Sequence, residues 1–158
     1  MTRESRAAAG VAELRWGDER RLSFLDDRLF WLGQVNRADL VDRFAISMSQ
    51  ASLDIAHYLT LNPKGIDYDK SAKRYVAGPA FRPVLAEPDA GRYLGELRLL
   101  DVGLMSAAET LTGDAPPFAA TPLPERRIDA FVLRTLLRGI REKLSVDTMY
   151  QSMSRPRP

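Results

Sequence analysis

The sequence predicts a mainly α-helical fold with a small β-wing: a winged helix-turn-helix followed by a helical connector. Two helical patterns separated by the three residues Ala-Ile-Ser lie between Asn36 and Leu61. Two short alternating segments then flank the turn Lys70–Lys73, and prolines follow them at positions 79 and 83. Helix, tight turn, helix and basic hairpin, in that order, are typical of a winged helix-turn-helix.

Composition excludes several classes of function. The chain has 158 residues, which suits one medium domain or one small domain with an extension. It has no cysteine, which excludes disulfides and thiol catalysis and fits a cytoplasmic location. With His57 as the single histidine and no evident nucleophile–base pair, we expect no metal, no cofactor and no enzyme. No signal peptide and no run of roughly 18 apolar residues is visible, so we expect no membrane association.

The charge of the chain is unevenly distributed. The net charge is only +2. Residues 36–82 hold seven Lys and Arg against five Asp and Glu, residues 83–124 hold two against six, and residues 125–158 hold eight against four. Binding to nucleic acid depends on local clusters of Lys and Arg, so the modest net charge does not exclude a DNA-binding protein.

Three helices are expected before the hairpin, after a loosely docked helical segment at residues 1–17. Asp18 is a candidate N-cap for a helix that ends near Leu32, and its leucines recur at spacings of three and four. Asn36 can cap the second helix, with Asp39 in the capping-box position. The third helix is predicted to begin at Ser47, with Gln50 in the equivalent position, and to stop before proline 63.

The hairpin and the segments after it are less regular. Ile-Asp-Tyr-Asp and Arg-Tyr-Val-Ala-Gly alternate as strands do and form the predicted wing. Residues 84–124 are expected to be a connector, with helix interrupted by Gly95 and Gly103 and then an exposed Pro-rich linker. We therefore divide the chain into a DNA-binding domain at residues 1–83, a connector at 84–124 and a final unit at 125–158.

The final unit is predicted to open with a helix from Glu125 to Leu144. Its apolar residues form a band too wide for a lone surface helix. We expect this band to form a homodimer interface through residues spaced four apart, namely Ile128, Val132, Leu136 and Ile140; the segment Tyr93–Leu111 is an alternative. A strand at Ser145–Ser152 should follow.

The outward face of the third helix indicates double-stranded DNA as the partner. A solvated helix face normally carries Lys and Glu, whereas this face is small, polar and almost uncharged. Gln50 can pair with adenine, Ser49 and Ser52 can bond to either base type, and Leu53 can contact a thymine methyl group. We expect these four residues to contact bases. A second group of residues is suited to contacts with the phosphate backbone: Arg37, Ser47, His57, Lys70, Ser71, Lys73 and Arg74.

Other interpretations of the same residues remain. The same three helices could form a protein-binding module that does not recognise a DNA sequence. Asp26 and Asp27 are expected to be surface charges, and the aromatic residues to be core rather than a platform for single strands. The arginines of the last helix could touch DNA, but we favour a packing helix with a solvated basic flank.

Residues 28–83 resemble the N-terminal winged helix of the BrxR/CapW group of WYL-domain transcriptional regulators. The resemblance rests on the following residues: Trp31-Leu-Gly, Asn36-Arg37, Phe44, Ile46-Ser47, Gln50-Ala51-Ser52, Asp54, Tyr58, Tyr68-Asp69, Ser71-Ala72-Lys73, Tyr75, Phe81 and Pro83. Residues 133–156 look like the helix and first strand that open the WYL domain of that group.

The resemblance implies a sequence-specific repressor of an anti-phage defence operon. Because one winged helix contacts few base pairs, such a protein would act as a dimer on an inverted repeat. The WYL domain of the group should continue well beyond Pro158, so the chain would be truncated early in that domain. We therefore expect this chain to bind no effector ligand.

Overall fold

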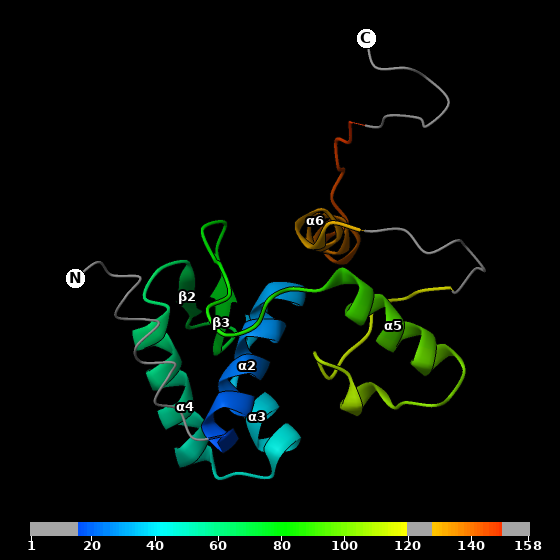
Figure 1. The fold of residues 1–158 in the computed structure, drawn as a ribbon. Helices are drawn as coiled ribbons and strands as arrows, with labels where there is room; N and C mark the ends of the chain where they lie inside the picture. The colour runs from blue at the N-terminus through cyan, green and yellow to red at the C-terminus, as the bar shows by residue number, and fades with distance from the viewer. Residues whose placement is uncertain (1–15, 120–127, 150–158) are drawn as a thin grey trace.

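The computed structural model describes residues 16–119 and 128–149 and shows a winged helix-turn-helix with two further helices (Figure 1). In chain order the elements are α2 (Trp16–Trp31), β1 (Gln34–Val35), α3 (Arg37–Phe44), α4 (Met48–Leu61), β2 (Ile66–Asp69), β3 (Arg74–Ala77), α5 (Ala90–Asp101), the 3₁₀ turn η1 (Ala107–Glu109) and α6 (Ala130–Glu142). The three strands form an antiparallel sheet in the order β1-β3-β2. The predicted mainly α fold with a β-wing is confirmed.

Helix α2 is the centre of the core. Its leucine stripe, Leu22, Leu25, Leu29 and Leu32, is buried, as predicted. In Figure 1, α4 lies on one side of α2, and α5 and α6 lie on the other. The aromatic residues expected in the core are there: Phe24, Phe30, Trp31 and Tyr58 are buried, and Phe44 and Tyr75 pack against them.

The helix-turn-helix is fixed by its caps. The Asn36 carboxamide accepts a hydrogen bond from the Asp39 N–H, and the Asp39 carboxylate accepts one from the Asn36 N–H at 2.6 Å, which completes the predicted capping box. Ala45 ends α3 in the left-handed region (φ 51°), so the chain turns sharply into α4. Ser47 caps α4 by accepting from the Gln50 N–H. The capping-box role expected for the Gln50 side chain is wrong, because that side chain bonds to Asp54 instead.

The wing is the β2–β3 hairpin, which places Tyr68 opposite Tyr75. The turn between the strands is closed by the Asp69 carboxylate, which accepts from the Ala72 N–H at 2.9 Å. The third strand, β1, was not predicted. It has only two residues, too few for a period-of-two pattern, and it pairs with the inner strand β3.

Several predicted boundaries differ from the structure. Helix α2 begins at Trp16, so Asp18 lies in its first turn rather than at its cap. Helix α5 continues through Gly95 without interruption, because a single glycine inside a helix costs only about 1 kcal/mol relative to alanine. Helix α6 begins at Ala130 after its N-cap Asp129, and the predicted start at Glu125 lies outside the described residues. Residues 144–149 form no strand, which corrects the predicted one as far as it is described.

Helices α5 and α6 pack against the C-terminal end of α2. The Tyr93 ring stacks on Trp31, with 4.4 Å between ring centroids. The Arg141 guanidinium donates to the carbonyl oxygens of Trp31 and Leu32, both at 2.8 Å, and so caps the end of α2. Arg134 lies over the Phe30 ring at 4.9 Å. The predicted solvated basic flank is therefore wrong for Arg134, which is half-buried, whereas Arg138 and Arg141 are exposed as predicted. Arginines 126 and 127 lie outside the described residues.

Asp26 is a buried hub rather than the predicted surface charge. Its side chain is fully buried, and it accepts hydrogen bonds from the Tyr58 hydroxyl and from the N–H groups of Val84, Leu85 and Ala86. Three segments therefore meet at one carboxylate: α2, α4 and the chain that leaves the wing. Burial raises the pKa of Asp26, while these hydrogen bonds oppose the rise.

Candidate nucleic-acid interface

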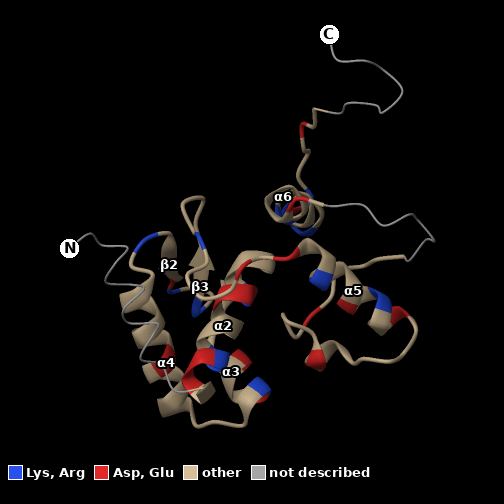
Figure 2. Cartoon of the chain, in the orientation of Figure 1, with Lys and Arg blue, Asp and Glu red and all other residues tan. Residues whose placement is uncertain are grey.

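The outward face of α4 carries no exposed charge. Ser49, Ala56 and His57 are exposed, and Leu53 is 65% exposed. Asp54 is the only acidic or basic residue of α4 apart from the single histidine, and it is 6% exposed (Figure 2). The surface is therefore open to close approach by a polyanion, with small groups that can fit a major groove.

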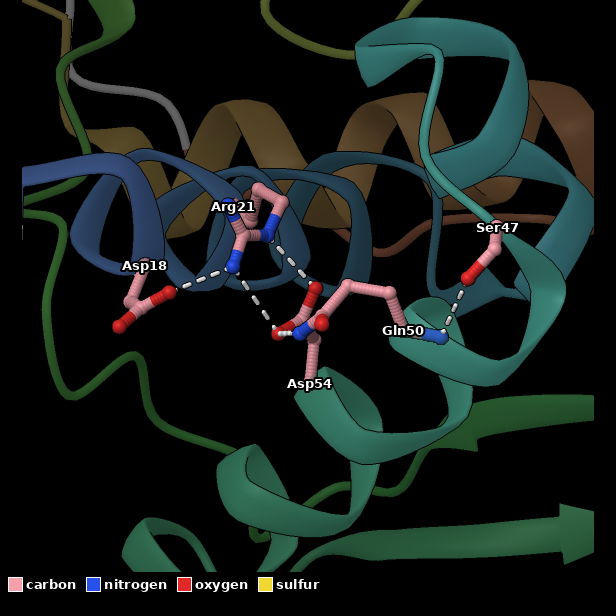
Figure 3. Close-up of polar contacts among 5 residues, drawn as sticks. All are labelled: Asp18, Arg21, Ser47, Gln50 and Asp54. Atoms are coloured by element: carbon pink, nitrogen blue, oxygen red, sulfur yellow. Dashed lines mark hydrogen bonds and ion pairs between the residues drawn. The ribbon is translucent and has the colours of Figure 1, made fainter.

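Gln50 and Ser52 are half-buried at the edge of this face. The Gln50 Nε2 atom donates to Asp54 Oδ1 at 2.8 Å, and Asp54 in turn accepts from the Arg21 guanidinium of α2 (Figure 3). The Ser52 hydroxyl donates to the Met48 carbonyl oxygen at 2.9 Å, which leaves its oxygen free to accept. The residues expected to contact bases thus share one helix, with Ser49 and Leu53 most exposed.

The residues expected to contact phosphate fall on three elements. Arg37 is exposed at the first position of α3, and Ser47 is exposed at the cap of α4. The Ser47 oxygen accepts from the Gln50 N–H, so its hydroxyl hydrogen can still be donated to an anion. At the wing turn Lys70, Ser71 and Lys73 are exposed.

Arg74 differs from the other wing residues. It opens β3 half-buried, and its Nε atom is buried without a hydrogen-bond partner among the described residues. A buried donor of this kind costs free energy unless a partner reaches it. Because it is half-buried, Arg74 is less available to phosphate than the two exposed lysines of the turn.

The four residues expected at a dimer interface lie away from α4. Val132, Leu136 and Ile140 are 57%, 38% and 59% exposed along one side of α6. Ile128 precedes the helix and is 46% exposed. Figure 1 shows α6 on the opposite side of α2 from α4, so the two faces do not compete for one partner.

A cleft that the sequence did not indicate lies beside α2, with a volume of about 450 Å³. Its walls include Trp16, Arg20, Asp27, Arg43 and Arg92. Burial raises the pKa of Asp27 to about 7, opposed by the nearby Arg92. Asp27 is half-buried in the cleft wall, where folding disfavours its charged form, so the prediction of an ordinary surface charge is wrong.

Replacing Asp27 with asparagine is expected to raise the free energy of unfolding at pH 8 by about 1–2 kcal/mol. The folded-state pKa lies above the unfolded value, so the contribution of Asp27 is fully present below pH 4 and is lost as the pH rises through 7. Wild-type protein should therefore gain stability between pH 8 and pH 5, and Asp27→Asn should gain less. Urea titrations at pH 5 and pH 8 measure the free energy of unfolding of each protein. Equal pH dependence in the two proteins would contradict the raised pKa of Asp27.

Neither a metal nor a membrane is indicated by the described part of the chain. No group of three or more His, Cys, Asp or Glu residues that could hold a metal ion occurs in residues 16–119 and 128–149. Within the same ranges, no helix has the length and apolar composition needed to cross a bilayer.

Comparison with known proteins agrees with this architecture. Residues 17–99, more than half of the chain, match the family described as the BrxR transcriptional regulator winged helix-turn-helix domain. The chain belongs to this family. The matched range begins in α2 and ends in α5, so it includes α4 and the whole wing.

Proteins named DNA-binding transcriptional repressor CapW are similar along nearly the whole chain. The repressor of Stenotrophomonas maltophilia is 39% identical over 151 residues, which cover 96% of this chain and 50% of the relative. That of Escherichia coli strain KTE188 is 42% identical over 142 residues, covering 90% and 48%. That of Pseudomonas aeruginosa is 39% identical over 162 residues, covering 99% and 54%. The chain thus spans about half the length of the curated relatives it matches.

Proposed function

We propose that this chain is the DNA-binding part of a transcriptional repressor that recognises a specific double-stranded operator as a dimer. The observation that carries the proposal is the outward face of α4, which is free of exposed charge and is followed along the chain by the lysines of the wing. In this arrangement α4 enters the major groove, where Ser49, Gln50, Ser52 and Leu53 contact base edges. The resemblance to the BrxR/CapW group extends the proposal to an operon of anti-phage defence.

Salt-dependent binding to duplex DNA tests the proposal. Binding that neutralises phosphates releases counterions, so the affinity should fall steeply as salt rises. The probe is a duplex carrying the intergenic region upstream of the gene, titrated at several salt concentrations against a shuffled duplex of the same composition. Equal, weak affinity for both duplexes would favour the competing interpretation, a winged helix that binds protein.

The wing should contribute affinity without sequence preference. Lys73→Ala is expected to weaken binding to every duplex by about 3- to 10-fold and to reduce the salt slope by about 1. A matched control exists, because Lys143 at the end of α6 is also exposed and has nearly the same left-handed backbone (φ 54° against 51°). Lys143→Ala should leave the affinity unchanged. A changed base preference in Lys73→Ala, measured on single-base operator variants, would contradict the role of the wing.

Dimerisation is proposed to use the exposed side of α6. Val132, Leu136 and Ile140 are spaced four apart and lack described contacts that would cover them. Ile140→Glu should therefore shift the chain from dimer to monomer at micromolar concentration in analytical ultracentrifugation. Arg138→Gln, a polar change at an exposed site of the same helix, should not. An unaltered dimer in Ile140→Glu would exclude this face.

Effectors are not expected to act on this chain alone. The segment after α6 forms no strand as far as residue 149, so no sheet wall is described there that could enclose a ligand. The affinity for duplex DNA should therefore be unchanged when cyclic nucleotides or short single-stranded oligonucleotides are added to the titration described above.

A further inference from the structure

The side chain of Gln50 is held by a polar network that begins in another helix. Arg21 of α2 donates to Asp54 of α4 through Nε at 2.6 Å and through Nη2 at 3.3 Å. Asp54 Oδ1 then accepts from Gln50 Nε2 at 2.8 Å (Figure 3). Arg21 is itself fixed by Asp18, at 2.5 Å. The Asp54 side chain is 7% exposed and that of Arg21 15%, so solvent screens their pairing little.

This network determines which way the Gln50 amide points. A carboxylate paired with a guanidinium offers only acceptors, so the amide group that faces Asp54 must be the NH₂. The amide oxygen Oε1 must then point away from Asp54, and one amide hydrogen remains unused. The Gln50 side chain therefore offers a nearby base one acceptor and one donor.

Adenine and guanine differ in how well they match this acceptor and donor of Gln50. In the major groove adenine presents a donor, N6–H, beside an acceptor, N7, whereas guanine presents two acceptors, O6 and N7. One acceptor and one donor on Gln50 complement adenine. Against guanine, the outward Oε1 would face an acceptor, and two lone pairs would repel each other.

We propose that Asp54, held by Arg21, is a positioning residue that makes Gln50 select adenine over guanine; this rests on the proposed function of α4 as the recognition helix. Without the carboxylate, the two ends of the amide could exchange by rotation of the terminal torsion, and Gln50 could donate to guanine as readily as it pairs with adenine. The base preference of α4 is then set partly from α2, which lies on the side of α4 away from the bases.

Asp54→Asn tests the proposal because it should reverse the network. Arg21 has only donors, so the carbonyl oxygen of the substituted side chain must face Arg21, and its NH₂ must face Gln50. Gln50 would then turn Oε1 toward that NH₂ and present its own NH₂ to the groove. With the 158-residue chain and a duplex pool randomised at the bound positions, enrichment sequencing should show one base position changing from adenine to guanine. The adenine-to-guanine affinity ratio there should fall roughly 5- to 150-fold.

Two further variants separate this effect from a general loss of structure. In a Gln50→Ala background, Asp54→Asn should change no base preference, since the side chain on which it acts is gone. Should Asp54→Asn fail to fold, the pair Arg21→Met with Asp54→Leu removes both charges with similar volume, and adenine and guanine should then be bound about equally at that position. A retained adenine preference in either Asp54 variant overturns the proposal.

The wild-type protein distinguishes this failure from failure of the proposed function. Both the proposed function and the proposed role of the network predict that the wild type enriches a defined site. That site should have adenine at one position, and this preference should depend on Gln50. If the wild type enriches no sequence, α4 is not a recognition helix, and both proposals fall together. If it enriches a site that Gln50→Ala leaves unaltered, sequence-specific binding stands without Gln50 among the base contacts, and the role of the Arg21–Asp54 network falls.

Discussion

Replacing Asp26 with alanine is expected to lower the free energy of unfolding by about 3–5 kcal/mol. The carboxylate is fully buried and is the shared acceptor for the Tyr58 hydroxyl and for three consecutive N–H groups, those of residues 84–86. Alanine would leave these donors without their shared acceptor, at a position that is itself fully buried. Each unsatisfied buried donor costs about 1–3 kcal/mol, so the sum is large even when part of it is relieved by relaxation.

Urea denaturation of matched variants measures this effect. Tyr58→Phe removes one donor and leaves the carboxylate with its backbone partners, so it should cost only about 1 kcal/mol. Asp27→Asn, at the adjacent position, should instead stabilise the protein at pH 8. If Asp26→Ala cost no more than Tyr58→Phe, the three N–H groups would have to be satisfied without Asp26, and its role as the hub would be refuted.

The same substitution should also affect recognition. Asp26 joins α2 to α4 through Tyr58, and it joins both to the chain leaving the wing. The helix and the wing are the two parts proposed to contact DNA, so their relative placement depends on this carboxylate. Below its melting temperature, Asp26→Ala should therefore bind every duplex more weakly, with no change in base preference.

The parts of the fold that the sequence predicted correctly are those set by local rules. The Asn36–Asp39 capping box involves residues three apart, and the buried leucine stripe of α2 follows from the helical repeat. Local rules also explain the errors. Asp26 was predicted to be a surface charge because the N–H groups that it accepts from lie at residues 84–86, far along the chain, and no pattern around Asp26 indicates them.

The candidate site shows the same division. The lack of charge on α4 is visible in its sequence, and this indicated the face proposed to contact DNA. The orientation of Gln50 is not visible there, because it depends on Arg21, and Arg21 and Asp54 are 33 residues apart. The hydrogen bonds of Arg141 were not visible for the same reason, since its acceptors are carbonyl oxygens at the end of α2.

Replacing Leu53 with glutamate should produce the largest loss of DNA affinity, about 100-fold or about 3 kcal/mol. Leu53 lies on the outward face of α4, which has no exposed acidic residue because Asp54 is buried beside Arg21. A carboxylate at this position would enter a groove bordered by phosphates, and both the repulsion and the lost apolar contact would weaken binding. The part of the loss that comes from repulsion should be similar for all sequences, and it should be smaller at high salt, where screening reduces the repulsion.

Val102 provides a matched control for this prediction, because it is also an aliphatic residue and is also 65% exposed. It follows α5, on the opposite side of α2 from α4 in Figure 1. Val102→Glu changes the net charge by the same amount as Leu53→Glu, and both variants should keep their stability within about 0.5 kcal/mol, since both sites are exposed. Fluorescence anisotropy with a labelled operator duplex should then show an affinity within about twofold of wild type for Val102→Glu. Equal losses in the two variants would mean that net charge, rather than the α4 face, governs binding, and α4 would not be the element that enters the groove.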